Sequence, residues 1–274
     1  MNAEEVRRQC KEDPEFILAV EEYRSVDYVS AYQRFCKIAA KGNVIAQYTA
    51  AMMNVDCDRI ERSPIEGYRF MEMAADSGYP GAQYCMGIFC STGFGCNASP
   101  EKAKDWFQMA AEQGHVQSQN ELGVIYREGK GCKKDDDLAF EWIWKAAIGG
   151  DPNAQYNLAV MYETGEGTSV SMGDAFKWYS QAASQGITEA QYCLGALYHL
   201  GKGTAENHTK AAFWYGEAAR SGHPDAEYNL GLMYMEGDGI PADYEKASAL
   251  FESAASKGIK DARDALNKVR EMME

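Results

Sequence analysis

The sequence contains no uninterrupted apolar stretch long enough to span a membrane. Its longest early apolar run covers residues 16–20, whereas a transmembrane helix needs about 20 apolar residues. Residues 1–16 also lack the apolar segment of a secretory signal. We therefore expect no membrane insertion and a cytoplasmic protein. A signal removed before residue 1 would instead indicate a secreted or periplasmic protein.

Basic residues are scarce relative to acidic ones. The chain has 27 Lys and Arg against 41 Asp and Glu, which gives a formal net charge of −14. Phosphate backbones and anionic membrane surfaces repel a chain with this balance. The composition therefore argues against nucleic acid as a partner and permits a partner with a basic patch, although an acidic surface also serves solubility alone.

Motifs for metal or redox chemistry are missing. None of the eight cysteines belongs to a CxxC pair, the motif of zinc ribbons and thioredoxin-like centres. The four histidines have no nucleophile or metal ligand at a fixed spacing; they are His115, His199, His208 and His223. We therefore predict that the protein is not an enzyme, with no catalytic residue, no cofactor and no metal site.

What the sequence does contain is a repeat of constant length. One glycine recurs every 36 residues, at Gly42, Gly78, Gly114, Gly150, Gly186, Gly222 and Gly258. Four positions after this glycine stands a small residue, and eight positions after it stands an apolar residue that is mostly larger. The two positions lie on one face of a helix. The spacing predicts a helix in the first half of each unit.

A turn and a second helix complete each unit. In five units two glycines one residue apart follow the first helix, and the first of them suits the left-handed residue that ends a helix. A residue with a short polar side chain, which caps a helix N-terminus well, stands 21 positions after each of the first six reference glycines: Ser63, Ser99, Asp135, Ser171, Asn207 and Asp243. The first unit has residues 54–59 in place of the glycine pair, so we expect a loop of different shape there.

One aromatic column marks the second helix. It consists of Phe70, Trp106, Trp142, Trp178 and Trp214, and ends with Leu250. We expect these side chains to pack between helices. Trp144 lies outside the column and either covers a neighbouring unit or is an exposed anchor for a partner.

These columns resemble the Sel-one-like repeat (SLR) family, relatives of the tetratricopeptide repeats. Residues 154–162 followed by Gly165 and Gly167 match the family pattern, and so do residues 226–239. The resemblance implies an all-α fold, an α/α right-handed superhelical solenoid. We expect six repeats over residues 42–258, between an N-terminal helical cap with a degenerate repeat (1–41) and a C-terminal capping helix (259–274), because repeat arrays need terminal caps.

The resemblance also implies an adaptor or scaffold role and places the first helices on the concave surface. Tyrosine recurs six residues after the reference glycine, and its apolar ring with a hydroxyl group suits recognition; the same tyrosines could instead pack across the repeat interface. Asn120 interrupts this column and would form a polar site with Arg127. The predicted protein- or peptide-binding residues are Tyr84, Asn120, Arg127, Tyr156, Asn157, Tyr192, His199 and Tyr228.

The predicted function is thus a non-catalytic adaptor that holds a protein or peptide along the concave face. Three alternatives stay open. They are a secreted or host-directed bacterial factor that binds a foreign protein, a ligand-binding or weakly enzymatic module, and a self-assembling structural protein. The second alternative requires a closed pocket, which this pattern does not predict, and the oligomeric state is open in all of them.

Overall fold

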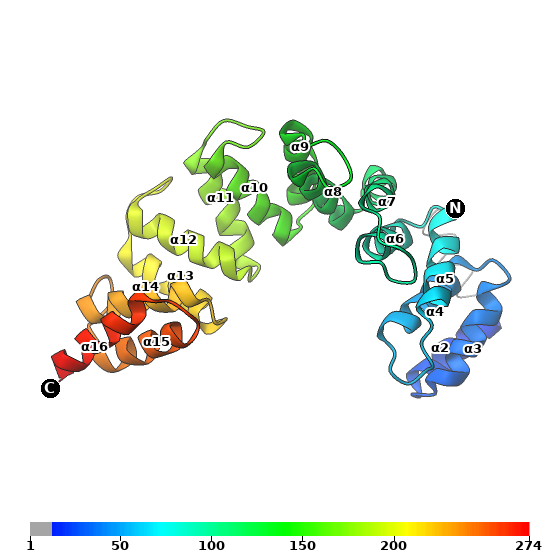
Figure 1. The fold of residues 1–274 in the computed structure, drawn as a ribbon, viewed down its shortest axis with the longest axis horizontal. Coiled ribbons are helices and arrows are strands. Elements are labelled where there is room, and N and C mark those ends of the chain that lie inside the picture. The colour runs from blue at the N-terminus through cyan, green and yellow to red at the C-terminus, as the bar shows by residue number, and fades with distance from the viewer. Residues whose placement is uncertain (1–12, 274) are drawn as a thin grey trace. The chain divides into compact units, whose positions relative to one another are not determined.

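The computed structural model describes residues 13–273, which form helices joined by short turns (Figure 1). Within this range there is no β-strand. None of the described helices is both long enough and apolar enough to cross a membrane. The all-α class and the repeated helix pairs predicted from the sequence are confirmed.

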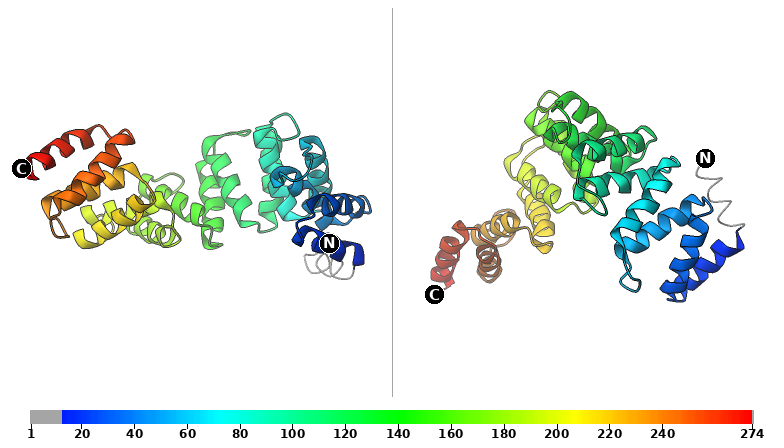
Figure 2. Two further views of the ribbon diagram at one scale, coloured as in Figure 1. Left: turned by 90° about the horizontal axis from the view of Figure 1, so that it is seen from below. Right: turned by 45° about the vertical axis from the view of Figure 1, so that its right-hand side comes forward.

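The chain divides into two compact units, the first ending at Trp142 and the second beginning at Ile143, within α9 (Asp136–Ile148). The other helices of the first unit are α2 (Pro14–Arg24), α3 (Tyr28–Ala39), α4 (Val44–Asp56), α5 (Pro64–Asp76), α6 (Pro80–Thr92), α7 (Pro100–Glu112) and α8 (Val116–Glu128). Those of the second unit are α10 (Pro152–Thr164), α11 (Met172–Ser184), α12 (Thr188–Leu200), α13 (His208–Arg220), α14 (Pro224–Glu236), α15 (Tyr244–Ser256) and α16 (Asp261–Met273). From α2 to α8 in the first unit and from α10 to α16 in the second, each helix packs against the next one along the chain (Figure 2).

The helix ends lie where the sequence predicts them. Asp135 Oδ1 accepts a hydrogen bond from the Leu138 amide at 3.0 Å, which satisfies an otherwise unpaired N–H at the start of α9. The other five predicted caps make the same bond: Ser63, Ser99, Ser171, Asn207 and Asp243. Gly165 ends α10 with φ +81°, in the left-handed region that glycine enters without strain. The predicted N-caps and glycine C-caps are therefore confirmed.

The first repeat closes its loop differently, as predicted. The helix α4 continues through Asp56, and Asn54 is buried inside it. Asn54 Oδ1 accepts a hydrogen bond from the Ser63 amide at 2.8 Å. In the next repeat the equivalent amide, that of Ser99, donates to the main-chain carbonyl of Cys90. A side-chain oxygen thus replaces a backbone oxygen in the repeat that lacks the glycine pair.

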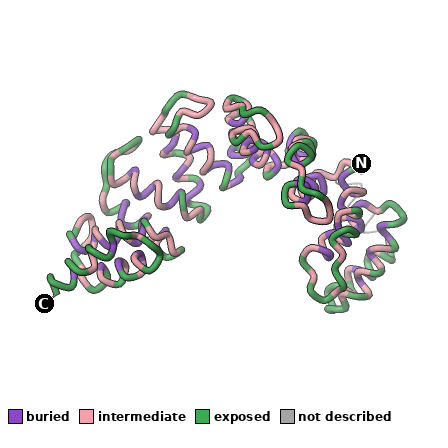
Figure 3. The backbone as a smooth tube through the Cα atoms, in the orientation of Figure 1, coloured by how far each residue is buried: buried purple, intermediate pink, exposed green. Residues whose placement is uncertain are grey.

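The buried residues lie along the contacts between helices, and exposed residues concentrate at the turns (Figure 3). The aromatic column of the second helices is half-buried, and Trp106, Trp178 and Trp214 pack against the cores of their units as expected. Trp144 has 42% of its surface exposed. The seven cysteines among the described residues are free thiols. Cys10 and residues 1–12 of the predicted N-terminal cap lie outside the described part of the chain.

In five of the six repeats, a glutamine five residues after the reference glycine ties the first helix to the helix before it. Its Nε2 donates to a main-chain carbonyl eight residues earlier at 3.2–3.3 Å, in Gln47, Gln83, Gln119, Gln155 and Gln191. In two repeats a second glutamine completes the arrangement, with Gln113 Nε2 2.7 Å from Gln83 Oε1 and Gln185 Nε2 2.7 Å from Gln155 Oε1. The sequence pattern alone did not indicate this role of the glutamines. We call these side chains the glutamine clamp.

Candidate functional site

The predicted tyrosines of the first helices are all half-buried. Each rests on an aromatic ring of the second helix of its own repeat, with ring centroids 5.8–5.9 Å apart. The pairs are Tyr84 with Phe107, Tyr156 with Tyr179, Tyr192 with Tyr215, and Tyr228 with Phe251. Because the supporting rings Phe107, Tyr179, Tyr215 and Phe251 are buried, the tyrosines are held in place while part of each stays at the surface.

Two of these tyrosines also pack across a repeat junction. The ring of Tyr192 stacks on His223 at 4.5 Å and an interplanar angle of 15°, and Tyr84 lies 5.1 Å from His115. Both histidines are N-caps, because His223 Nδ1 accepts from the Ala226 amide and His115 Nδ1 from the Ser118 amide. Burial lowers the pKa of His115. The column therefore serves the repeat interface and also presents aromatic surface.

The other predicted residues differ in exposure. Arg127 and Asn157 are half-buried. Asn120 is only 7% exposed, so it offers little surface to a partner. Tyr84, Asn120 and Arg127 belong to the first unit, and the remaining predicted residues belong to the second.

A pocket opens between adjacent repeats of the second unit, with a volume of about 320 Å³. Tyr192 and His199 of α12 line one side, and Asn229 and Leu232 of α14 line the other. Asp238, in the turn after α14, also contributes to the wall. Two of the predicted binding residues thus share one cavity, and the sequence pattern did not predict it.

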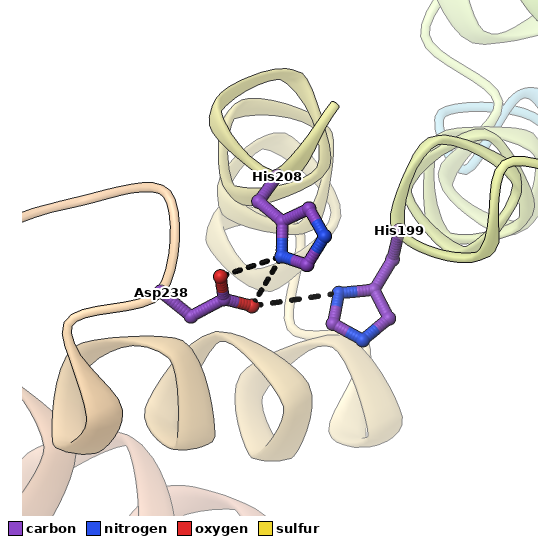
Figure 4. A group of neighbouring side chains, drawn as sticks. All are labelled: His199, His208 and Asp238. Atoms are coloured by element: carbon purple, nitrogen blue, oxygen red, sulfur yellow. Dashed lines mark hydrogen bonds and ion pairs between the residues drawn. The ribbon is translucent and has the colours of Figure 1, made fainter. Parts of the chain in front are cut away.

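His199 lies beside two groups that the sequence analysis did not connect with it (Figure 4). Its Nδ1 is 3.8 Å from Asp238 Oδ2. Asp238 Oδ1 and Oδ2 lie 2.5 and 2.6 Å from His208 Nδ1, and Glu206 Oε1 lies 2.6 Å from His208 Nε2. Hydrogen bonds to Asp238 and Glu206 raise the pKa of His208.

His199, His208 and Asp238 come close enough together to hold a metal ion. Within residues 13–273, no other set of three His, Cys, Asp or Glu side chains does so. The three are 9 and 30 residues apart in sequence, so no local motif links them. Counted from the reference glycine, His199 and His208 stand 13 and 22 residues into one repeat, and Asp238 stands 16 residues into the next. The three meet because these positions face one another at the repeat junction. No signal in the sequence marks the set, because the register between neighbouring repeats decides which of these columns meet.

The repeat family accounts for most of the chain. A family model of the Sel1 repeat matches residues 56–79, 80–115, 116–151, 152–187, 188–223 and 224–259. Among the curated proteins compared with the chain, none matches.

Two solved structures are similar over most of the sequence. A Sel1 repeat protein from Oxalobacter formigenes is 32% identical, with a TM-score of 0.79, over 88% of this chain and 70% of that chain. A protective antigen present in uropathogenic Escherichia coli strains, which displays an SLR fold, is 30% identical with a TM-score of 0.85. That match covers 93% of this chain and 56% of the antigen, so the chain spans little more than half of the antigen's length. On the family match and these two likenesses, the chain belongs to the Sel1 repeat family.

Proposed function

We propose that this protein is a non-catalytic adaptor that binds a protein or peptide along the face of its first helices, the concave face of the predicted superhelix. Sel1 repeat proteins are in general scaffolds for protein interactions. For this chain, the observation that carries the proposal is the pocket between α12 and α14. It combines an anchored aromatic ring, Tyr192, with polar side chains at its edge.

The lining of this pocket indicates what kind of segment it would take. Leu200 is 56% exposed and, with Tyr192 and Leu232, supplies apolar surface for one side chain of a partner. Glu236 and Asp238 stand at the same pocket and would attract a basic group. We expect a peptide in which an apolar residue lies next to Lys or Arg, in agreement with the net charge of −14.

Half-exposed tyrosines stand at the same position in other repeats of both units. Tyrosine loses little conformational entropy on binding and is enriched among residues that dominate binding energy. The rings beneath Tyr84, Tyr156 and Tyr228 hold them as they hold Tyr192. We propose that these tyrosines, with Arg127 and Asn157, contact the rest of the partner segment.

The test is affinity capture from the native cell extract, followed by binding measurements on the purified partner. Replacing Tyr192 by Ala should weaken binding at least about tenfold, as expected for an aromatic anchor. The matched control is Phe213→Ala, which removes an aromatic side chain that is 54% exposed on α13 and lines a different pocket. A partner that loses affinity with the Phe213 variant and not with the Tyr192 variant would place the binding surface on the second helices.

One observation favours a second location for the same binding activity, outside the producing cell. The similar Escherichia coli protein is a protective antigen, and such a protein meets a host. The alternative of a secreted or host-directed factor therefore stands beside the cytoplasmic one. Fractionation of the producing cells with an antibody against this chain distinguishes them, because only export would place the protein in the medium or on the cell surface.

A further inference from the structure

We propose that His199, His208 and Asp238 bind a divalent transition-metal ion of the zinc type, with Glu206 orienting His208. His199 and Asp238 also line the pocket of the proposed adaptor surface, but metal binding does not depend on the adaptor function. Imidazole nitrogen and carboxylate oxygen are ligands that zinc accepts in proteins, and three protein ligands leave one position for water or another donor.

The three ligands come from three different elements of the second unit (Figure 4). His199 lies at the end of α12, His208 at the start of α13, and Asp238 in the turn that follows α14. One ligand atom from each lies within 4.8 Å of the others. The two imidazole rings are 4.9 Å apart between centroids, so all three side chains converge on one point.

The two ring nitrogens of His208 face different carboxylates. Glu206 Oε1 lies 2.6 Å from Nε2, and Asp238 Oδ1 lies 2.5 Å from Nδ1. Because Nδ1 is the nitrogen on the Asp238 side, it is the atom that His208 would offer to a metal ion bound by Asp238. Glu206 would then hold the ring through Nε2.

His199 supplies the second, independent observation. Its Nδ1 is inaccessible to solvent and has no hydrogen-bond partner, although buried polar atoms are nearly always paired. The atom lies 3.8 Å from Asp238 Oδ2. A metal ion bound to Asp238 would give this nitrogen the partner that it lacks.

The distances need only small side-chain movements to fit zinc. Zn–N and Zn–O bonds of about 2.0–2.2 Å place tetrahedral ligand atoms roughly 3.3 Å apart. The His208–Asp238 separation of 2.5 Å is shorter than this, and the His199–Asp238 separation of 3.8 Å is longer. Glu206 on the remote nitrogen of His208 matches the carboxylate–histidine–zinc arrangement that fixes ring orientation at metal sites.

The fold holds the Asp238 turn against the start of α13. Gly239 is packed so tightly there that a Cβ atom at this position would overlap the backbone of His208. Thr209 Oγ1 also donates to the Gly239 carbonyl at 2.9 Å. The position of Asp238 beside His208 is therefore built into the repeat junction.

The ligand set does not recur at the preceding junction. There the corresponding side chains are Glu163, Met172 and Lys202. A lysine in the place of Asp238 and a methionine in the place of His208 would not hold zinc together with Glu163. The metal would therefore join one particular pair of repeats, 186–221 and 222–257.

The first experiment is calorimetric titration of the full chain, previously treated with a chelator, with Zn²⁺. We expect one site that His199→Gln, His208→Ala and Asp238→Asn each abolish, and a Zn²⁺-dependent rise in melting temperature that the same variants lose. Glu206→Gln should weaken Zn²⁺ binding about 10–100-fold, the usual cost of losing a carboxylate that supports a metal-bound histidine. The half-exposed position of His199 makes its variant the safest against misfolding.

Two controls separate this site from others in the chain. His223→Asn removes a histidine of the same unit while keeping an N-cap residue, and Zn²⁺ binding should be unchanged. Binding of Co²⁺ should produce a spectrum without thiolate charge-transfer bands, because cysteine is not among the proposed ligands. Zn²⁺ affinity that survives all three ligand variants, or that disappears when the thiols are alkylated, would overturn the proposal.

Discussion

The ring of Phe251 lies directly against the backbone of Gly231, so that a Cβ atom on this glycine would stand 2.7 Å from Phe251 Cε1. The same contact joins Gly195 with Tyr215 at 2.7 Å and Gly87 with Phe107. These are the rings on which the surface tyrosines rest. The small residue nine positions into each repeat therefore sets how closely the second helix approaches the first.

Substituting Gly231 by Val should destabilise the protein. The side chain would displace the fully buried Phe251 ring, and overpacking of this kind costs about 1–3 kcal/mol. The matched control is Gly216→Val, because the nearest atom to a Cβ there is Leu230 Cδ2 at 3.9 Å and a pocket of about 520 Å³ adjoins it. Urea unfolding followed by circular dichroism measures both. Equal midpoints for the two variants would show that the Gly231–Phe251 contact is not tight.

Lys257 and Glu227 replace the glutamine clamp in the last repeat. Glu227 is buried, and its Oε1 lies 2.6 Å from Lys257 Nζ, while its Oε2 has no hydrogen-bond partner. Lys257→Ala should lower the unfolding free energy by about 1–3 kcal/mol, because a buried carboxylate loses a charged hydrogen bond. The loss should be smaller than for a fully buried ion pair, because the lysine side chain is 35% exposed.

The double variant Glu227→Gln, Lys257→Gln provides the counterpart to this prediction. It restores the two glutamines found at Gln83 and Gln113, with an amide that can donate to the Ala219 carbonyl. We expect its stability to lie within about 1 kcal/mol of the wild type, as for replacement of a buried ion pair by a well-fitted neutral pair. A double variant as unstable as Lys257→Ala would show that the charges themselves are required.

Arg34 of α3 joins this helix to α2. Its Nε and Nη2 donate to Glu22 at 3.0 and 2.8 Å, and its Nη1 donates to Glu15 at 2.6 Å. Arg34→Gln should therefore increase amide exchange in α2 at pH 7. Lys41→Gln, which removes an exposed positive charge nearby in the sequence, is the control and should leave α2 unchanged.

The effect of Arg34→Gln should depend on pH in one direction. The hydrogen bonds from Arg34 lower the pKa of Glu22 below its ordinary value. The pair is thus fully stabilising above the unfolded pKa of about 4.3 and loses its effect as the pH falls through the lower folded pKa. At equal pH, the ratio of the amide exchange rate of α2 in the variant to that in the wild type should approach one as the solution becomes acidic. A ratio that stays constant down to pH 3 would contradict the assigned ion pair.

The sequence predicted the features of this fold that local chemistry determines. Ser99 and Asp135 were expected as N-caps and Gly165 as a left-handed C-cap, because each requirement is set by a few neighbouring residues. The burial of Asn120 was not foreseen, since the pattern places it only on a helix face and not at a depth. The binding role of the surface tyrosines stays a prediction.

Contacts between repeats explain what the sequence could not reveal. Gln83 was visible in its column, but its donation to the carbonyl of Ala75 depends on the packing of two helices. His199, His208 and Asp238 share no window of sequence shorter than a repeat. Their meeting depends on the register between neighbouring repeats, which the spacing of glycines alone does not specify.

The glutamine clamp has a consequence for how such an array changes in evolution. Each side-chain pair, whether Gln83 with Gln113 or Glu227 with Lys257, lies inside one 36-residue repeat, and the bond to the preceding helix uses only a main-chain carbonyl. Unequal recombination in steps of one repeat would therefore carry both partners together. The gene could lengthen or shorten in this way without leaving a buried charge unmatched at the new junction.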